Sequence, residues 1–170
     1  MKTLKIINTF NFTSDDFIQI ITSNDYYKFL KDNDDQLLDF NFEYFNINEN
    51  ELDYKVNLKY KSIITEYVSK FLGSDINDNV SEIINYNIKK KICKTKINSK
   101  SLDKLSASIE YEYKLKDNNK SCDQEIIYNF SSSIPLISSY IESSIEERLK
   151  TKSKFLYNLQ VKYYNKKYKN

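Results

Sequence analysis

The sequence predicts a single α+β domain in which a curved, seven-stranded antiparallel sheet wraps around one long C-terminal helix. Seven segments alternate apolar and polar residues, which is the period of a strand with one buried face. Short segments with helical spacing follow the first strand and separate the third strand from the fourth. The last third of the chain carries one apolar stripe that needs a partner surface, and the strands are the only candidate.

The C-terminal helix is predicted from Pro135 onward, because apolar residues recur there at three- and four-residue steps. Pro135 suits a first helical turn, and Ser132 or Ser133 is a candidate N-cap. A helix of roughly 30 residues would be about 45 Å long. The stripe consists of Leu136, Ile137, Tyr140, Ile141, Ile145, Leu149, Phe155, Leu156, Leu159 and Tyr163.

The earlier elements follow from local patterns. The first strand is predicted between Leu4 and Phe12, a helix starts at 14–16, and a second begins at Ser23 or Asn24. Residues 63–72 return to helical spacing, and Gly73, the only glycine, stands where a left-handed C-terminal cap is needed. The strand that follows residues 63–72 places Glu82 on the same face as its apolar members.

Earlier in the chain, the second strand is predicted to turn Leu38, Phe40, Phe42 and Tyr44 toward the core.

No linker or repeat divides the chain, so residues 1–170 are predicted to form one domain with a core at about 4–163. Residues 164–170 interleave lysine with tyrosine, and we expect a frayed, solvated terminus there. The alternative interpretation is that this segment contacts an anionic membrane surface or single-stranded nucleic acid.

The composition excludes several function classes. The net charge of +2 gives no strong field for nucleic acid. The two cysteines fit a reducing compartment, with a lone disulfide as the less favoured alternative. No apolar run reaches the length of a signal peptide or a membrane span. We expect a cytoplasmic protein, monomeric and without a nucleic-acid partner.

The order of elements resembles the helix-grip fold of the START-like superfamily, which includes the birch-pollen allergen and polyketide cyclases. Two motifs add to this resemblance, 71–75 (FLGSD) before a strand and 133–137 (SIPLI) followed by Ile141-Glu142. They resemble an uncharacterised START-like family known mainly from bacteria. That family has small residues where this chain has Ser138-Ser139-Tyr140, so Tyr140 is expected to add bulk near the helix start. The resemblance implies binding of lipids, sterols or other hydrophobic ligands, and in some members cyclisation.

The inner face of the predicted sheet is rich in aromatic residues. One interpretation is an apolar cavity with a few hydroxyl groups that orient a ligand; the other is a solid core with paired phenols. The sequence leaves both open. Tyr60 is also predicted on this face. The candidate ligand-binding residues are Phe40, Phe42, Tyr54, Tyr86, Thr95, Tyr111, Tyr113, Tyr128, Tyr140, Ile141, Ile145 and Arg148.

Two charged residues are candidates for polar contacts in such a cavity. An inward Glu82 would contact a ligand head group or act as an acid or base. A one-residue bulge would turn it outward, and this is the interpretation that the sequence alone favours. Arg148 could bind an anionic head group, or pair with Glu147 or a carboxylate of the sheet.

Catalytic motifs are scarce. The chain has no histidine, no closely spaced cysteines and no glycine-rich phosphate loop, so we expect neither a metal nor a cofactor. The sequence therefore favours binding, and transfer inside the cell, of a hydrophobic, lipid-like ligand, with transient membrane contact. An enzyme of the cyclase or hydrolase type that uses carboxylates and tyrosines is one alternative. A protein-binding, co-chaperone-like module is the other.

Overall fold

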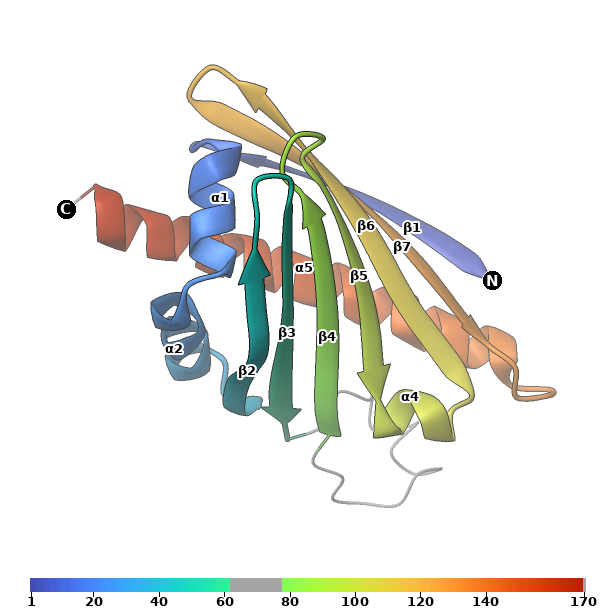
Figure 1. Ribbon diagram of the computed structural model, residues 1–170. Coiled ribbons are helices and arrows are strands. Elements are labelled where there is room, and N and C mark those ends of the chain that lie inside the picture. Colours follow the sequence, from blue (N-terminus) through green and yellow to red (C-terminus); the bar gives the residue numbers. More distant parts are fainter. Residues whose placement is uncertain (62–77, 170) are drawn as a thin grey trace.

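In the computed structural model, which describes residues 1–61 and 78–169, an antiparallel sheet curves around one long helix (Figure 1). In chain order the elements are β1 (Lys2–Phe10), α1 (Ser14–Ile21), α2 (Asn24–Asn33), β2 (Leu37–Ile47), β3 (Glu51–Tyr60), β4 (Asp78–Asn87), β5 (Ile92–Ser99), α4 (Lys100–Lys104), β6 (Ala107–Asn118), β7 (Ser121–Ser132) and α5 (Ser138–Tyr168). The described strands form one seven-stranded sheet in the order β1-β7-β6-β5-β4-β3-β2. This confirms the predicted fold class. The helix predicted at 63–72, the Gly73 cap and the 71–75 motif lie outside the described residues.

Strict alternation along the strands gives the sheet one buried face. In β3 every second residue from Leu52 to Tyr60 is buried, and the residues between them are more exposed. The pairing of β4 with both β3 and β5 is continuous over its length, so its inward and outward sides do not change between Asp78 and Tyr86. The sheet therefore presents one uninterrupted inner surface to α5.

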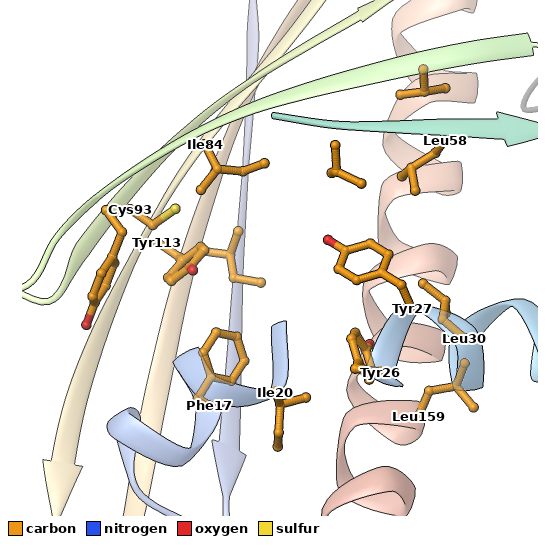
Figure 2. Packing of buried hydrophobic residues seen from close by; sticks show 14 of the residues in the cluster. Phe17, Ile20, Tyr26, Tyr27, Leu30, Leu58, Ile84, Cys93, Tyr113 and Leu159 are labelled. Carbon is orange, nitrogen blue, oxygen red and sulfur yellow. The ribbon is translucent and has the colours of Figure 1, made fainter. Parts of the chain in front are cut away.

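Helices α1 and α2 lie at one end of the sheet, and a side-chain cap fixes the residue at which each of them begins. Thr13 and Asp16 form a capping box at α1, and the Ser23 hydroxyl accepts a hydrogen bond from the Tyr26 N–H at α2. Their apolar sides face the core (Figure 2), where Phe17 packs edge-on against Tyr113 at 5.7 Å between ring centroids. In the same view Leu30 of α2 lies close to Leu159 of α5.

Strand β2 departs from its predicted alternation. Irregular pairing at Leu37/Asp39 and at Phe42/Tyr44 shifts which residues face inward. Leu37 rather than Leu38 pairs with inward-facing Tyr60, and Tyr44 points outward. Phe45 replaces Tyr44 on the inner side, with its ring 5.9 Å from that of Tyr54. The predictions for Leu38 and Tyr44 were wrong, because each bulge inserts a residue that the period-two pattern does not count.

Helix α5 begins at Ser138, three residues later than predicted from Pro135. The Ser133 N–H donates to the Ser106 carbonyl at 3.1 Å, so this serine continues the edge of β7 instead of capping a helix. Leu136 has a positive φ of 69° and is fully exposed. The chain needs this left-handed turn to reverse from strand to helix, and Leu136 therefore cannot join the apolar stripe.

The C-terminal segment is helical to Tyr168, so the expected fraying was wrong for residues 164–168. Tyr164 stacks on the buried Phe12 with ring centroids 4.4 Å apart. Lys167 Nζ donates to the Tyr163 hydroxyl at 3.5 Å. The Tyr164–Phe12 contact holds the last turns of α5 against the loop that follows β1, and the Lys167–Tyr163 hydrogen bond lies within α5.

The short helix α4, between β5 and β6, was not predicted. The Ser99 side chain caps it by accepting the Leu102 N–H, and the following turn passes through Ser106 with a positive φ of 43°. Leu105, the C-cap residue of α4, is buried and anchors this turn.

Along its length α5 packs against β1, β7 and α2 (Figure 1). Its buried apolar residues are Ile141, Ile145, Leu159 and Tyr163. Both cysteines are buried and free, and burial raises the pKa of the Cys93 thiol to about 11. Among residues 1–61 and 78–169, no helix has both the length and the apolar character needed to cross a membrane.

The contact between α5 and the core can be tested with two leucines. Leu159 is 6% exposed, so Leu159→Ala should lower the free energy of unfolding by roughly 2–5 kcal/mol through lost burial and a residual void. Leu136→Ala removes the same atoms from a fully exposed site and should change it by less than about 0.5 kcal/mol. Urea denaturation followed by circular dichroism measures both, and equal losses would show that α5 does not pack as described.

Candidate functional site

Two adjoining cavities lie between the inner face of the sheet and α5. The larger has a volume of about 360 Å³ and is bounded by β4–β6, α4, the loop after α2 and the first half of α5. Its apolar walls come from Val80, Ile97, Leu102, Leu105, Ile109, Ile141, Ile145, Leu149 and Phe155. Binding sites for small molecules usually have volumes of roughly 300–1,000 Å³ and mostly apolar walls, so the larger cavity has the size and character of such a site.

The smaller cavity, about 170 Å³, lies nearer to α1 and α2. Tyrosines supply much of its wall: Tyr26, Tyr27, Tyr54, Tyr60, Tyr111, Tyr113 and Tyr128. Burial raises the pKa of the Tyr128 phenol to about 12 and that of Tyr54 well above its ordinary value. These phenols therefore stay neutral at physiological pH and are able to donate hydrogen bonds.

A group of side chains separates the two cavities, because Tyr60, Glu82, Ile97, Leu149 and Lys152 line both. Lys152 Nζ is 2.6 Å from the Asp34 carboxylate and lies over the Tyr60 ring at 4.8 Å. Asp34 is buried, so this ion pair is shielded from solvent on the side of the loop that follows α2. The pair joins that loop to the middle of α5.

Glu82 faces inward and lines both cavities, so the outward interpretation favoured by the sequence was wrong. The continuous register of β4 explains this, since no bulge reverses its faces. Burial raises the pKa of the Glu82 carboxyl, while the charge of Lys152 and a hydrogen bond from Tyr111 oppose the rise. The carboxyl keeps some exposed surface only because it borders the cavities.

Asp78 stands at the start of β4 and lines the larger cavity. It is 1% exposed, and neither carboxylate oxygen has a hydrogen-bond partner among the described residues. A buried carboxylate is normally hydrogen-bonded or paired, because removing it from water without compensation is costly. Asp78 is therefore a buried polar group in the wall of the cavity, without a partner in the part of the chain that the structure describes.

The structure distributes the predicted site residues over four places: the two cavities, the packed core and the exposed surface of α5. Glu82, Ile141, Ile145 and Arg148 line the larger cavity, and Tyr54, Thr95, Tyr111, Tyr113 and Tyr128 line the smaller one. Phe40 and Phe42 instead pack on the Tyr27 ring, at 5.5 and 5.0 Å between centroids. Tyr86 is buried in the core away from both cavities. Tyr140 is 47% exposed on α5, so its bulk does not fill the interior as expected.

Sequence reasoning missed Asp34, Asp78 and Lys152. The sequence contained a signal for two of them: Asp78 has the same strand parity as Glu82, and Lys152 follows Ile145 by two helical turns, which places it on the apolar stripe. Asp34 follows the end of α2 and belongs to no periodic pattern, so the sequence contained no signal for it. In the structure it is buried where it pairs with Lys152.

Comparisons with known proteins identify the fold. No family model and no curated protein matches the chain. Among solved structures, the Zhui aromatase/cyclase from Streptomyces sp. R1128 matches with a TM-score of 0.68 at 6% identity, covering 99% of this chain and 98% of that one. Ara h 8.0201 matches with a TM-score of 0.65 at 9% identity, covering 95% and 96%. A START superfamily protein from Mycobacterium smegmatis matches with 0.58 at 9%, covering 92% and 94%.

At such low identities the likeness concerns the fold alone. The curved sheet and long C-terminal helix of this chain match those proteins over nearly the whole length of each. The chain has the START-like helix-grip fold.

Proposed function

We propose that this protein binds, and carries between sites in the cell, a hydrophobic, lipid-like molecule held between the sheet and α5. The observation that supports this most is the larger cavity of about 360 Å³, whose surface is contributed mainly by apolar side chains. A solid core was the alternative, and it does not account for two adjoining cavities in the interior, because protein cores are normally close-packed.

The energy of burial is sufficient for reversible binding. A ligand that loses about 400 Å² of exposed apolar surface gains roughly 10 kcal/mol. Association costs at least about 4 kcal/mol, which leaves at most roughly 6 kcal/mol. This corresponds to a dissociation constant no lower than tens of micromolar, before any hydrogen bond to the head group is counted. Affinity of this order suits a ligand that must be released again, for example during transient contact with a membrane.

A second candidate function is acid–base catalysis on a ligand in the same cavity. It is favoured by Glu82, an inward carboxyl with a raised pKa that borders both cavities and faces Lys152 and Tyr111. A carboxyl whose pKa moves toward neutrality is suited to act as a general acid.

Filling the larger cavity should abolish ligand binding. Ile109 lies on the cavity wall, so Ile109→Trp is expected to weaken binding of the neutral dye Nile red by at least about tenfold, since the indole occupies the ligand's space. Ile83→Trp adds the same side chain to the outer face of β4 and is the matched control. Fluorescence titration measures both, and circular dichroism shows whether each variant is folded. Equal Nile red affinities in the two folded variants would exclude this cavity as the binding site.

The natural ligand should be captured from a mixture of cellular lipids. Native mass spectrometry of protein mixed with a lipid extract above that dissociation constant should show an adduct with the mass of a lipid, because the cavity removes apolar surface of the guest from water. The adduct should persist in Ile83→Trp and be absent from Ile109→Trp. Wild-type protein that never carries an adduct, and that also fails to bind Nile red, would refute the proposed function.

Ionisation of Glu82 should lower stability as the pH rises. Burial raises the pKa of Glu82 in the folded state above its ordinary value of 4.5. At pH values between the unfolded-state pKa and the folded-state pKa, the folded state binds more protons than the unfolded state. The free energy of unfolding therefore falls as the pH rises through this window. Glu82→Gln mimics the protonated form. Its melting temperature should equal that of the wild type below pH 4.5 and exceed it progressively at higher pH.

The matched control for this measurement is Glu110→Gln, which removes a carboxylate from the outer side of β6. A pH series of thermal melts compares the three proteins. Wild-type protein that gains stability relative to Glu82→Gln as the pH rises would show that ionised Glu82 is stabilised in the fold, and would remove the support for the second candidate.

A further inference from the structure

The larger cavity holds a carboxylate that the rest of the described chain does not satisfy. Asp78 is 1% exposed, both of its oxygens lack a hydrogen-bond partner among residues 1–61 and 78–169, and its side chain lines the cavity. It pairs with Tyr60 across β3 and β4, which fixes it on the inner face beside Val80. β4 therefore holds a buried hydrogen-bond acceptor without a partner in the wall of the cavity.

The charges around Asp78 favour a cation. Of the described lining residues, Asp34, Asp35, Asp78 and Glu82 carry carboxylates, whereas only Arg148 and Lys152 are basic. Lys152 is already paired with Asp34 at 2.6 Å, so its charge is compensated. Within the described residues no three carboxylate or thiol side chains come close enough together to hold a metal ion. An organic cation fits this arrangement better than a metal ion does.

We propose that the ligand is an amphipathic amine whose protonated nitrogen donates a hydrogen bond to the Asp78 carboxylate. This inference rests on the proposed function and specifies its ligand class. The amine lies at the Asp78 end of the cavity, and the apolar body extends over Ile109, Ile141 and Ile145 toward Glu82. Asp78 and Glu82 are four residues apart on one strand, about 13 Å at roughly 3.3 Å per residue, which leaves room for an aliphatic chain between them.

Three probes of equal chain length separate head-group recognition from burial of the chain. Decylamine, decanol and decanoate are each used to displace Nile red from delipidated wild-type protein at neutral pH. A hydrogen bond between charged partners in a buried site should make decylamine bind at least about tenfold more tightly than decanol. Decanoate should bind more weakly than decanol, because its charge repels Asp78.

Asp78→Asn keeps the shape of the side chain and removes its charge. It should abolish the preference for decylamine and leave the affinity for decanol unchanged. It should also raise the melting temperature of the ligand-free protein, because an unpaired buried charge is lost. Asp103→Asn, on the exposed side of α4, makes the same change of charge outside the cavity and should retain the preference. A lower melting temperature in Asp78→Asn would instead assign the carboxylate a structural role and overturn the inference.

The outcomes distinguish the two proposals. If decanol displaces Nile red and decylamine shows no advantage, or if decanoate binds best, the amine inference fails while ligand binding stands. If none of the three probes displaces the dye, the amine inference fails, and the proposed function is decided by Nile red binding and by the lipid adduct. A preference for decylamine that survives Asp78→Asn would place the recognition elsewhere and overturn the assignment of Asp78.

Discussion

The contact of α5 with the inner face of the sheet is the interaction on which the rest of the structure depends. The sheet has one apolar face that water must not reach, and α5 is the element long enough to cover it. α5 packs against β1, β7 and α2, but it stands away from the middle strands, where the two cavities lie. Closure of the core and the formation of a binding space are therefore consequences of the same incomplete contact. Any change that pressed the middle of α5 onto β4 and β5 would bury more apolar surface and remove the cavity.

The periodic parts of the fold could be predicted from the sequence, and the irregular parts could not. The alternation in β3 and β7 and the stripe around Ile141, Ile145 and Leu159 report directly which side of an element is buried. The errors fall where backbone geometry breaks the period. These are the bulges that expose Tyr44, the left-handed turn at Leu136 and the capped turn of α4. Such features are decided by hydrogen bonds between segments distant in sequence, which a local pattern does not contain.

The candidate site divides in the same way. Parity along β4 was enough to place Glu82 inside, and the favoured outward alternative failed because the register has no bulge there. The same parity applied to Asp78, and helical spacing applied to Lys152, but neither position was considered for the site. No pattern could place Asp34, whose burial comes from the tertiary contact with Lys152. Aromatic content was a weaker guide. Phe40, Phe42 and Tyr86 have the expected inward orientation, yet they pack into the core instead of lining a cavity.

The charged groups at the cavity differ in how well the fold compensates them, and this difference separates structure from function. Lys152 and Asp34 compensate each other within hydrogen-bond distance, and their contact joins the loop after α2 to α5. Glu82 has partial compensation from Lys152 and Tyr111. Asp78 has none within the described chain. A protein selected only for stability would replace an unpaired buried carboxylate, because an apolar or amide side chain there lowers the free energy of the folded state. Local rules are broken most often at functional sites, so the least compensated group marks the part of the cavity where a ligand supplies the missing partner.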